Sequence, residues 1–253
     1  MAGENIYVPS SALDSFAFAL NADIIPEIGT RNPLLQVKLK LNKNKPQFST
    51  VQFVVTHYIR GEEKYKTIEL ETKLVYAKAA LKCLENYSNK PFDQTKDIQV
   101  WEVKAPKKVN GKMTSERITA GKLVVGRNEK GVFISVVHWN DKWPHIAFYP
   151  GNNDQMNVVN PAAGDQKRQY EYVCNTARGW ADTVGGLLVT EFSHGTNLII
   201  EALRRQKEQN GGGQGSSYGG DNYNNNNNVK EGSYDYGDST TESYSSSDDQ
   251  FNF

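Results

Sequence analysis

Basic and aromatic side chains are interspersed over one stretch of the chain, from Ile98 to Gly151. This window holds nine Lys or Arg residues and four acids, a net charge of +5, and its rings are Trp101, Phe133, Trp139, Trp143, Phe148 and Tyr149. Cations bind phosphates and flat apolar rings stack on unpaired bases, so the mixture is typical of surfaces that bind single-stranded nucleic acid. Aromatic residues on strands also pack in cores, which is the alternative interpretation for each ring.

Lysine runs provide the second part of this signal. Lys104–Arg117 is predicted to be a flexible basic loop between strands, and an earlier run lies within Leu34–Phe48. One run alone indicates no more than a solvated face, but two runs at sheet edges or loops favour phosphate binding. Trp139 and Trp143, which flank a turn, are the stronger ring candidates. The residues expected to contact DNA are Lys38, Lys40, Lys43, Lys45, Trp101, Lys104, Lys107, Lys108, Lys112, Arg117, Lys122, Arg127, Lys130, Phe133, Trp139 and Trp143.

The sequence contains no recognisable catalytic or metal-binding pattern. The four histidines, His57, His138, His145 and His194, accompany no nucleophile motif and form no ligand cluster, and the chain has no GxSxG. Gly111-Lys112 and Gly121-Lys122 are not followed by Ser or Thr, so the phosphate-binding loop spacing fails. Cys83 and Cys174 lie in apolar helical patterns and are expected to be buried free thiols. We expect no enzyme activity, no cofactor and no metal.

Charge divides the chain into two unlike parts, although its formal net charge is zero. Residues 211–253 hold seven acids and one base, while residues 1–210 hold 28 bases and 22 acids. The acidic segment is rich in Gly, Ser and Asn, so we expect a disordered tail. A tethered polyanion can compete with DNA for a basic surface. The tail ends in two acids and two rings that we expect to bind partner proteins: Asp248, Asp249, Phe251 and Phe253.

Residue periodicity predicts an α+β body with antiparallel sheets. Alternation of apolar and polar residues predicts strands at Leu34–Leu41, Thr50–Arg60, Lys64–Glu71, Ile98–Ala105, Ile118–Gly126, Val132–Trp139 and Trp143–Tyr149. Helical stripes predict a helix at Thr72–Tyr87, a long helix that Asp165 caps, and a last helix at Asn197–Glu208. Gly179, Gly185 and Gly186 are expected to break or kink the long helix. The body, residues 1–210, is expected to contain one unit or two β-α units, 30–90 and 98–208.

The ends of the chain and its hydropathy give expectations about location. The first residues have no basic and apolar leader pattern, and no run approaches the roughly 18 apolar residues of a membrane span. We therefore expect a soluble, cytoplasmic protein that does not use a membrane.

Two segments resemble known families. The tail ending Asp248-Asp249-Gln250-Phe251-Asn252-Phe253 resembles the acidic tips of phage and bacterial single-stranded DNA-binding proteins, which implies recruitment of replication partners. The segment Gly121–Pro150, followed by a helix, resembles the positive cofactor 4/Whirly family, which implies a four-stranded meander plus helix, single-strand binding on the sheet and a homodimer or higher oligomer. An OB-fold is the alternative architecture.

The expected function combines these resemblances with the residue patterns. We expect a low-specificity single-stranded DNA-binding protein that protects DNA and recruits partners in phage replication, recombination and late transcription, in the host cytoplasm. The alternatives are a transcription regulator that binds duplex DNA, and a virion or structural protein.

Overall fold

A computed structural model of the chain describes residues 10–25, 31–58, 65–91, 96–109, 112–138, 145–150 and 165–211, together with Ile6 and Val8. Trp139, Trp143 and the predicted tail from residue 212 onward lie outside these residues, as do the side chains of Lys108 and Lys112.

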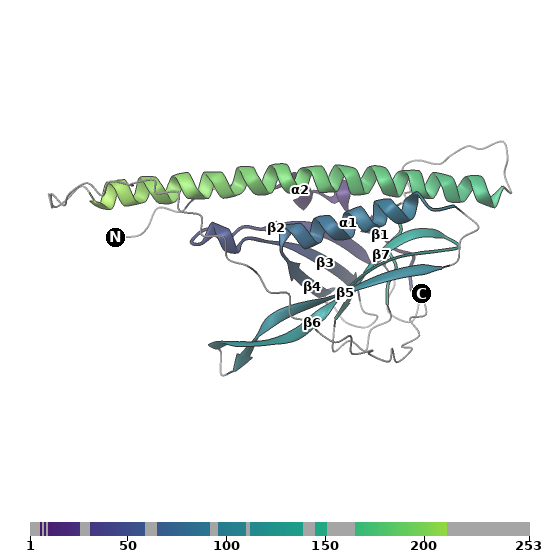
Figure 1. Cartoon of the computed structure of the whole chain (residues 1–253), viewed down its shortest axis with the longest axis horizontal. Coiled ribbons are helices and arrows are strands. Elements are labelled where there is room, and N and C mark those ends of the chain that lie inside the picture. The colour runs from purple at the N-terminus through teal and green to yellow at the C-terminus, as the bar shows by residue number, and fades with distance from the viewer. Residues whose placement is uncertain are drawn as a thin grey trace, which may run out of the picture.

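The first sheet has four antiparallel strands in the order β1-β2-β3-β4 (Figure 1). They are β1 (Leu20–Asn21), β2 (Leu34–Lys40), β3 (Thr50–Tyr58) and β4 (Tyr65–Thr72). Successive side chains of a strand point to opposite faces, so Leu35 and Val37 enter the core while Lys38 and Lys40 face away from it. The three predicted strands of this region are confirmed, whereas β1 is too short to leave a periodic signal.

The second sheet has three antiparallel strands, β5 (Asp97–Val109), β6 (Lys112–Asn128) and β7 (Gly131–His138). The flexible basic loop predicted at Lys104–Arg117 is wrong, because β5 and β6 stay paired as far as Val109 and Lys112. Register shifts after Val103 and Pro106 accommodate a proline that a regular strand interior would exclude. The strand predicted at Trp143–Tyr149 is reduced, in its described part, to one bridge between Ile134 and Phe148.

Two helices follow the sheets, α1 (Leu74–Ser88) and α2 (Gln166–Gly211). The backbone N–H of Arg168 donates to Oδ1 of Asp165 at 3.2 Å, which confirms the predicted cap. The predicted break and separate last helix are wrong, since α2 runs through all three glycines for 46 residues. Three short 3₁₀ helices complete the described structure, η1 (Ala12–Asp14), η2 (Phe16–Phe18) and η3 (Pro46–Phe48).

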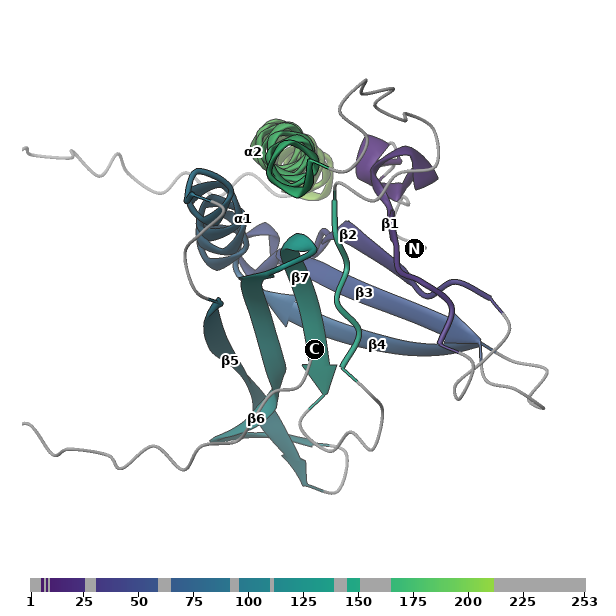
Figure 2. The same cartoon turned by 90° about the vertical axis from the view of Figure 1, so that its right-hand side faces the viewer.

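Both helices lie on one side of the molecule and the sheets diverge beneath them (Figure 2). One apolar cluster includes Phe53 of the first sheet, Leu84 of α1, Ile134 of the second sheet and Leu188 of α2, all fully buried. The two β-α units therefore share one core. Cys174 is buried within it and Cys83 lies partly buried at its edge, and burial raises the pKa of both thiols. None of the helices in the described part of the chain is long and apolar enough to cross a membrane.

Two glycines give opposite expectations for substitution by alanine. A Cβ at Gly186 on α2 would meet no atom within 4 Å, so Gly186→Ala should stabilise the protein by about 0.5–1 kcal/mol through better helix propensity. Gly131 has φ +133°, and its Cβ would lie 2.4 Å from Cγ1 of Val173, so Gly131→Ala should destabilise by about 1–3 kcal/mol. Urea unfolding of both variants measures this. A stabilised Gly131→Ala variant would contradict the seating of α2 on the β6–β7 turn.

Candidate nucleic-acid interface

A two-stranded ribbon projects from the second sheet and carries most of the predicted cations. We call it the basic arm and define it as Lys104–Val109 of β5 and Lys112–Thr119 of β6. The described part of β7 pairs with β6 only from Gly121 to Asn128, so the arm extends beyond the third strand and away from the helices (Figure 1). The arm has five bases, Lys104, Lys107, Lys108, Lys112 and Arg117, and one acid, Glu116.

The cations of the arm differ in their exposure and in whether they form an ion pair. Nζ of Lys107 donates to both carboxylate oxygens of Glu116, at 2.9 and 3.0 Å, so these two charges compensate each other. Lys104 and Arg117 are exposed and form no ion pair with any residue that the structure describes. The register pairs Lys104 with Thr119 and Pro106 with Arg117, so both cations lie on one face of the ribbon, and Ile118, 39% exposed, lies on the other. The arm therefore offers two exposed cations on one face, with no ion pair to a residue that the structure describes.

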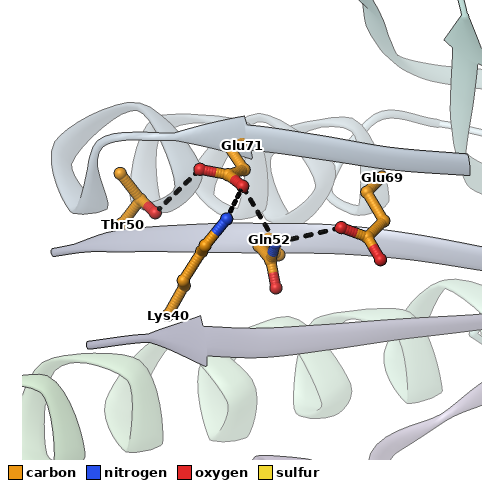
Figure 3. A network of polar contacts seen from close by, with 5 residues as sticks. All are labelled: Lys40, Thr50, Gln52, Glu69 and Glu71. Carbon is orange, nitrogen blue, oxygen red and sulfur yellow. Dashed lines mark hydrogen bonds and ion pairs between the residues drawn. The ribbon is translucent and has the colours of Figure 1, made fainter. Parts of the chain in front are cut away.

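The outer face of the first sheet is more balanced in charge than its lysines alone indicate. Figure 3 shows Lys40 bound to Glu71, whose carboxylate also accepts from Nε2 of Gln52 at 3.1 Å. The same amide donates to Glu69 at 3.3 Å. Lys38 and Lys40 of β2 thus share a face with two carboxylates of β4, and Lys40 is already compensated. The sequence of β2 does not reveal this balance, because the carboxylates come from a strand about 30 residues further along the chain.

The turn between β2 and β3 adds a ring that the search for basic residues missed. Phe48 of η3 is 61% exposed, and Nζ of Lys45 lies 6.0 Å from the centroid of its ring. Lys43 is also exposed, and its Nζ donates to the carbonyl of Ile6 at 2.8 Å. A cation and an exposed ring in contact are the pair that stacking on an unpaired base requires. The signal available in the sequence was a phenylalanine within a Lys- and Pro-containing turn.

Two predicted contact residues are buried, which corrects their assignment to the surface. Arg127 is 2% exposed, and its Nη2 donates to the carbonyl of Pro91 while the guanidinium stands 5.5 Å from the Tyr170 ring. Phe133 is 1% exposed and packs in a second apolar cluster, its ring centroid 5.7 Å from that of Tyr149. In this conformation neither side chain can touch a DNA strand.

The remaining residues predicted to contact DNA are partly buried or lie in a turn. Trp101 is partly buried and packs against the main core, and Lys122 is partly buried on the opposite face of its sheet. Lys130 is exposed in the β6–β7 turn. Apart from Lys40 on the first sheet, the exposed residues of the predicted set therefore lie on the arm and in two turns rather than on one sheet face.

Comparisons with protein-family models, with curated proteins and with solved structures find no match for this chain in any of the three. The class that the structure itself defines is an α+β protein with two antiparallel sheets and a long C-terminal helix.

Two arginines of the predicted set differ in burial, so their substitution should affect stability differently. Arg127→Ala should lower the free energy of unfolding by about 2–3 kcal/mol, because it empties a buried site and leaves the Pro91 carbonyl without its charged donor. Arg117→Ala on the exposed arm should change stability by less than about 0.5 kcal/mol. Denaturant unfolding compares the two variants with the parent. Equal stability of all three would remove the structural role assigned to Arg127.

Proposed function

We propose that this chain is a non-enzymatic protein that binds single-stranded DNA with low sequence specificity. The observation that carries the proposal is the basic arm, where Lys104 and Arg117 are exposed and unpaired on a ribbon with no third strand among the described residues. Exposed cations along an extended ribbon can follow a phosphate backbone without reading base edges. Binding of this kind is tolerant of sequence and sensitive to salt.

The turn that holds Phe48 favours single strands over duplex. Its ring is exposed beside Lys45, and such a ring can stack only on a base that is not already paired and stacked. The basic arm alone also fits the second candidate, a duplex-binding regulator, because the major groove admits a two-stranded ribbon. The two candidates differ in which substrate competes better.

The order of elements supports a Whirly-like arrangement over an OB-fold. A sheet followed by a helix occurs twice, in β1–β4 with α1 and in β5–β7 with α2. An OB-fold closes its strands into one barrel, whereas the described strands form two separate sheets. We propose accordingly a protein of this architecture that acts in the cytoplasm, in replication, recombination or late transcription of a phage, as a dimer or higher oligomer.

The arm proposal predicts a change in salt dependence. Full-length protein should bind oligo(dT) with quenching of Trp fluorescence, and the logarithm of affinity should fall linearly with the logarithm of salt concentration. In the double variant Lys104→Ala/Arg117→Ala that slope should decrease by about 1.4, since each lost phosphate contact on a single strand removes about 0.7. The matched control is Lys78→Ala/Lys207→Ala, which removes two exposed charges from the helices. Equal slopes for both doubles, or tighter binding to duplex, would refute the proposal.

The charge division predicts a second effect. Deleting residues 211–253 removes a net charge of −6 from a chain whose remainder carries +6, so affinity for oligo(dT) should rise several-fold at low salt and converge with the parent at high salt. Binding of partner proteins should fall. The control is a full-length chain whose tail acids are changed to Asn and Gln, which should behave like the deletion in DNA binding. An unchanged low-salt affinity in both would leave the tail without a competing role.

A further inference from the structure

A cavity of about 510 Å³ lies where α1 ends and α2 begins, at the end of the molecule away from the tip of the basic arm (Figure 1). The end of α1 and the residues after it form one wall, from Ser88 to Pro91. The other wall comes from the first turns of α2, from Lys167 to Arg178. The volume lies within the range of small-ligand sites in proteins. We call this cavity the α1–α2 pocket.

The walls of the pocket carry more positive than negative charge. Lys90, Lys167 and Arg178 line it, against one carboxylate, Glu171. Lys90 is held by Asp97 and stands 4.6 Å above the ring of Tyr87, so its charge is engaged outside the pocket. Lys167 is exposed and Arg178 is half-buried. The amides of Asn89 and Asn175 add neutral donors to the lining.

Two guanidinium groups, one lining the pocket and one behind its wall, each have a buried nitrogen with no hydrogen-bond acceptor among the residues that the structure describes. Nη2 of Arg178 reaches the carbonyl of Ser88 at 3.4 Å, a long contact, and its Nε is buried with no acceptor. Arg127 contacts two lining residues, Pro91 and Tyr170, and its Nη1 is also buried with no acceptor. A buried donor without an acceptor is costly. Of the two groups only Arg178 lines the pocket, where its single long contact to Ser88 leaves the guanidinium weakly satisfied, so a ligand oxygen that contacts this group would be favoured.

We propose that the α1–α2 pocket binds the phosphate group of a ligand of about mononucleotide size. A phosphate offers several oxygens in different directions, which matches donors that approach from Arg178, Lys167 and the asparagine amides. The partly apolar lining, with Tyr170, suits the rest of the ligand. The size of the cavity admits a free nucleotide or the phosphorylated end of a strand, but not a run of nucleotides. This inference does not depend on the proposed function of the arm.

Calorimetric titration of the full-length protein tests the pocket directly. AMP should bind and adenosine should not, because the phosphate carries the interaction. Arg178→Gln should weaken AMP binding at least tenfold, whereas Arg204→Gln, the same change on an exposed arginine of α2, should leave it within twofold. Should Arg178→Gln fail to fold, Lys167→Gln at an exposed position should still weaken AMP binding about threefold.

Oligonucleotides distinguish the two sources of the phosphate. The competition is measured in salt high enough to suppress DNA binding by the arm. If 5′-phosphorylated oligo(dT) competes with AMP and the unphosphorylated oligomer does not, the pocket binds the end of a strand. If neither oligomer competes, the pocket binds free nucleotides. Equal binding of adenosine and AMP, no binding of AMP at 10 mM ligand, or an unchanged affinity in Arg178→Gln and Lys167→Gln would overturn the inference. Oligo(dT) binding at low salt should be the same in these variants, so failure here leaves the arm proposal standing.

Discussion

The packing of α2 across both sheets is the contact on which the whole body depends. Each sheet turns an apolar face toward the helices, and neither a sheet nor a helix could keep such a face from water alone. Leu188 and Ala181 of α2 enter the same core as Phe53 of the first sheet and Ile134 of the second. A chain that repeats a sheet followed by a helix thereby becomes one body, because the second helix closes the core of the first unit as well as its own.

This shared core determines where polar function can lie. The core-facing side chains of the strands pack against other apolar side chains. On the outer face of the first sheet, carboxylates bind Lys40 and Gln52 and offset the positive charge. Among the cations predicted to contact DNA, those that are exposed and form no ion pair with a described residue consequently lie where strands or turns extend past the core, at the arm and in the β2–β3 and β6–β7 turns. At the opposite end, the junction of the two helices forms a pocket lined by Arg178, whose Nε has no acceptor among the residues that the structure describes. The two proposed binding sites are therefore physically separate.

Local periodicity was enough to predict most strands and α1, because one apolar face with period 2 or 3.6 is a local property of the sequence. Prediction from local periodicity failed where contacts with residues distant in the sequence determine the structure. The arm was expected to be a loop since Pro106 and a run of lysines interrupt the alternation, and only the register shifts opposite β6 keep it paired. The glycines of α2 cost helix propensity, roughly 1 kcal/mol each, but packing of the helix on both sheets outweighs that local preference. Likewise, Arg127 resembles a surface cation in the sequence, and its burial depends on Pro91 and Tyr170, which lie 36 residues before it and some 40 residues after it.

The continuity of α2 also fixes a point of attachment. At 1.5 Å per residue, its 46 residues make a rod about 69 Å long, and the C-terminal end of this helix lies toward the same side of the view as the tip of the basic arm (Figure 1). A break at the glycines would have let the last turns of α2 point in other directions. The unbroken helix therefore fixes where the residues after Gly211 begin, on the side of the basic arm and away from the α1–α2 pocket.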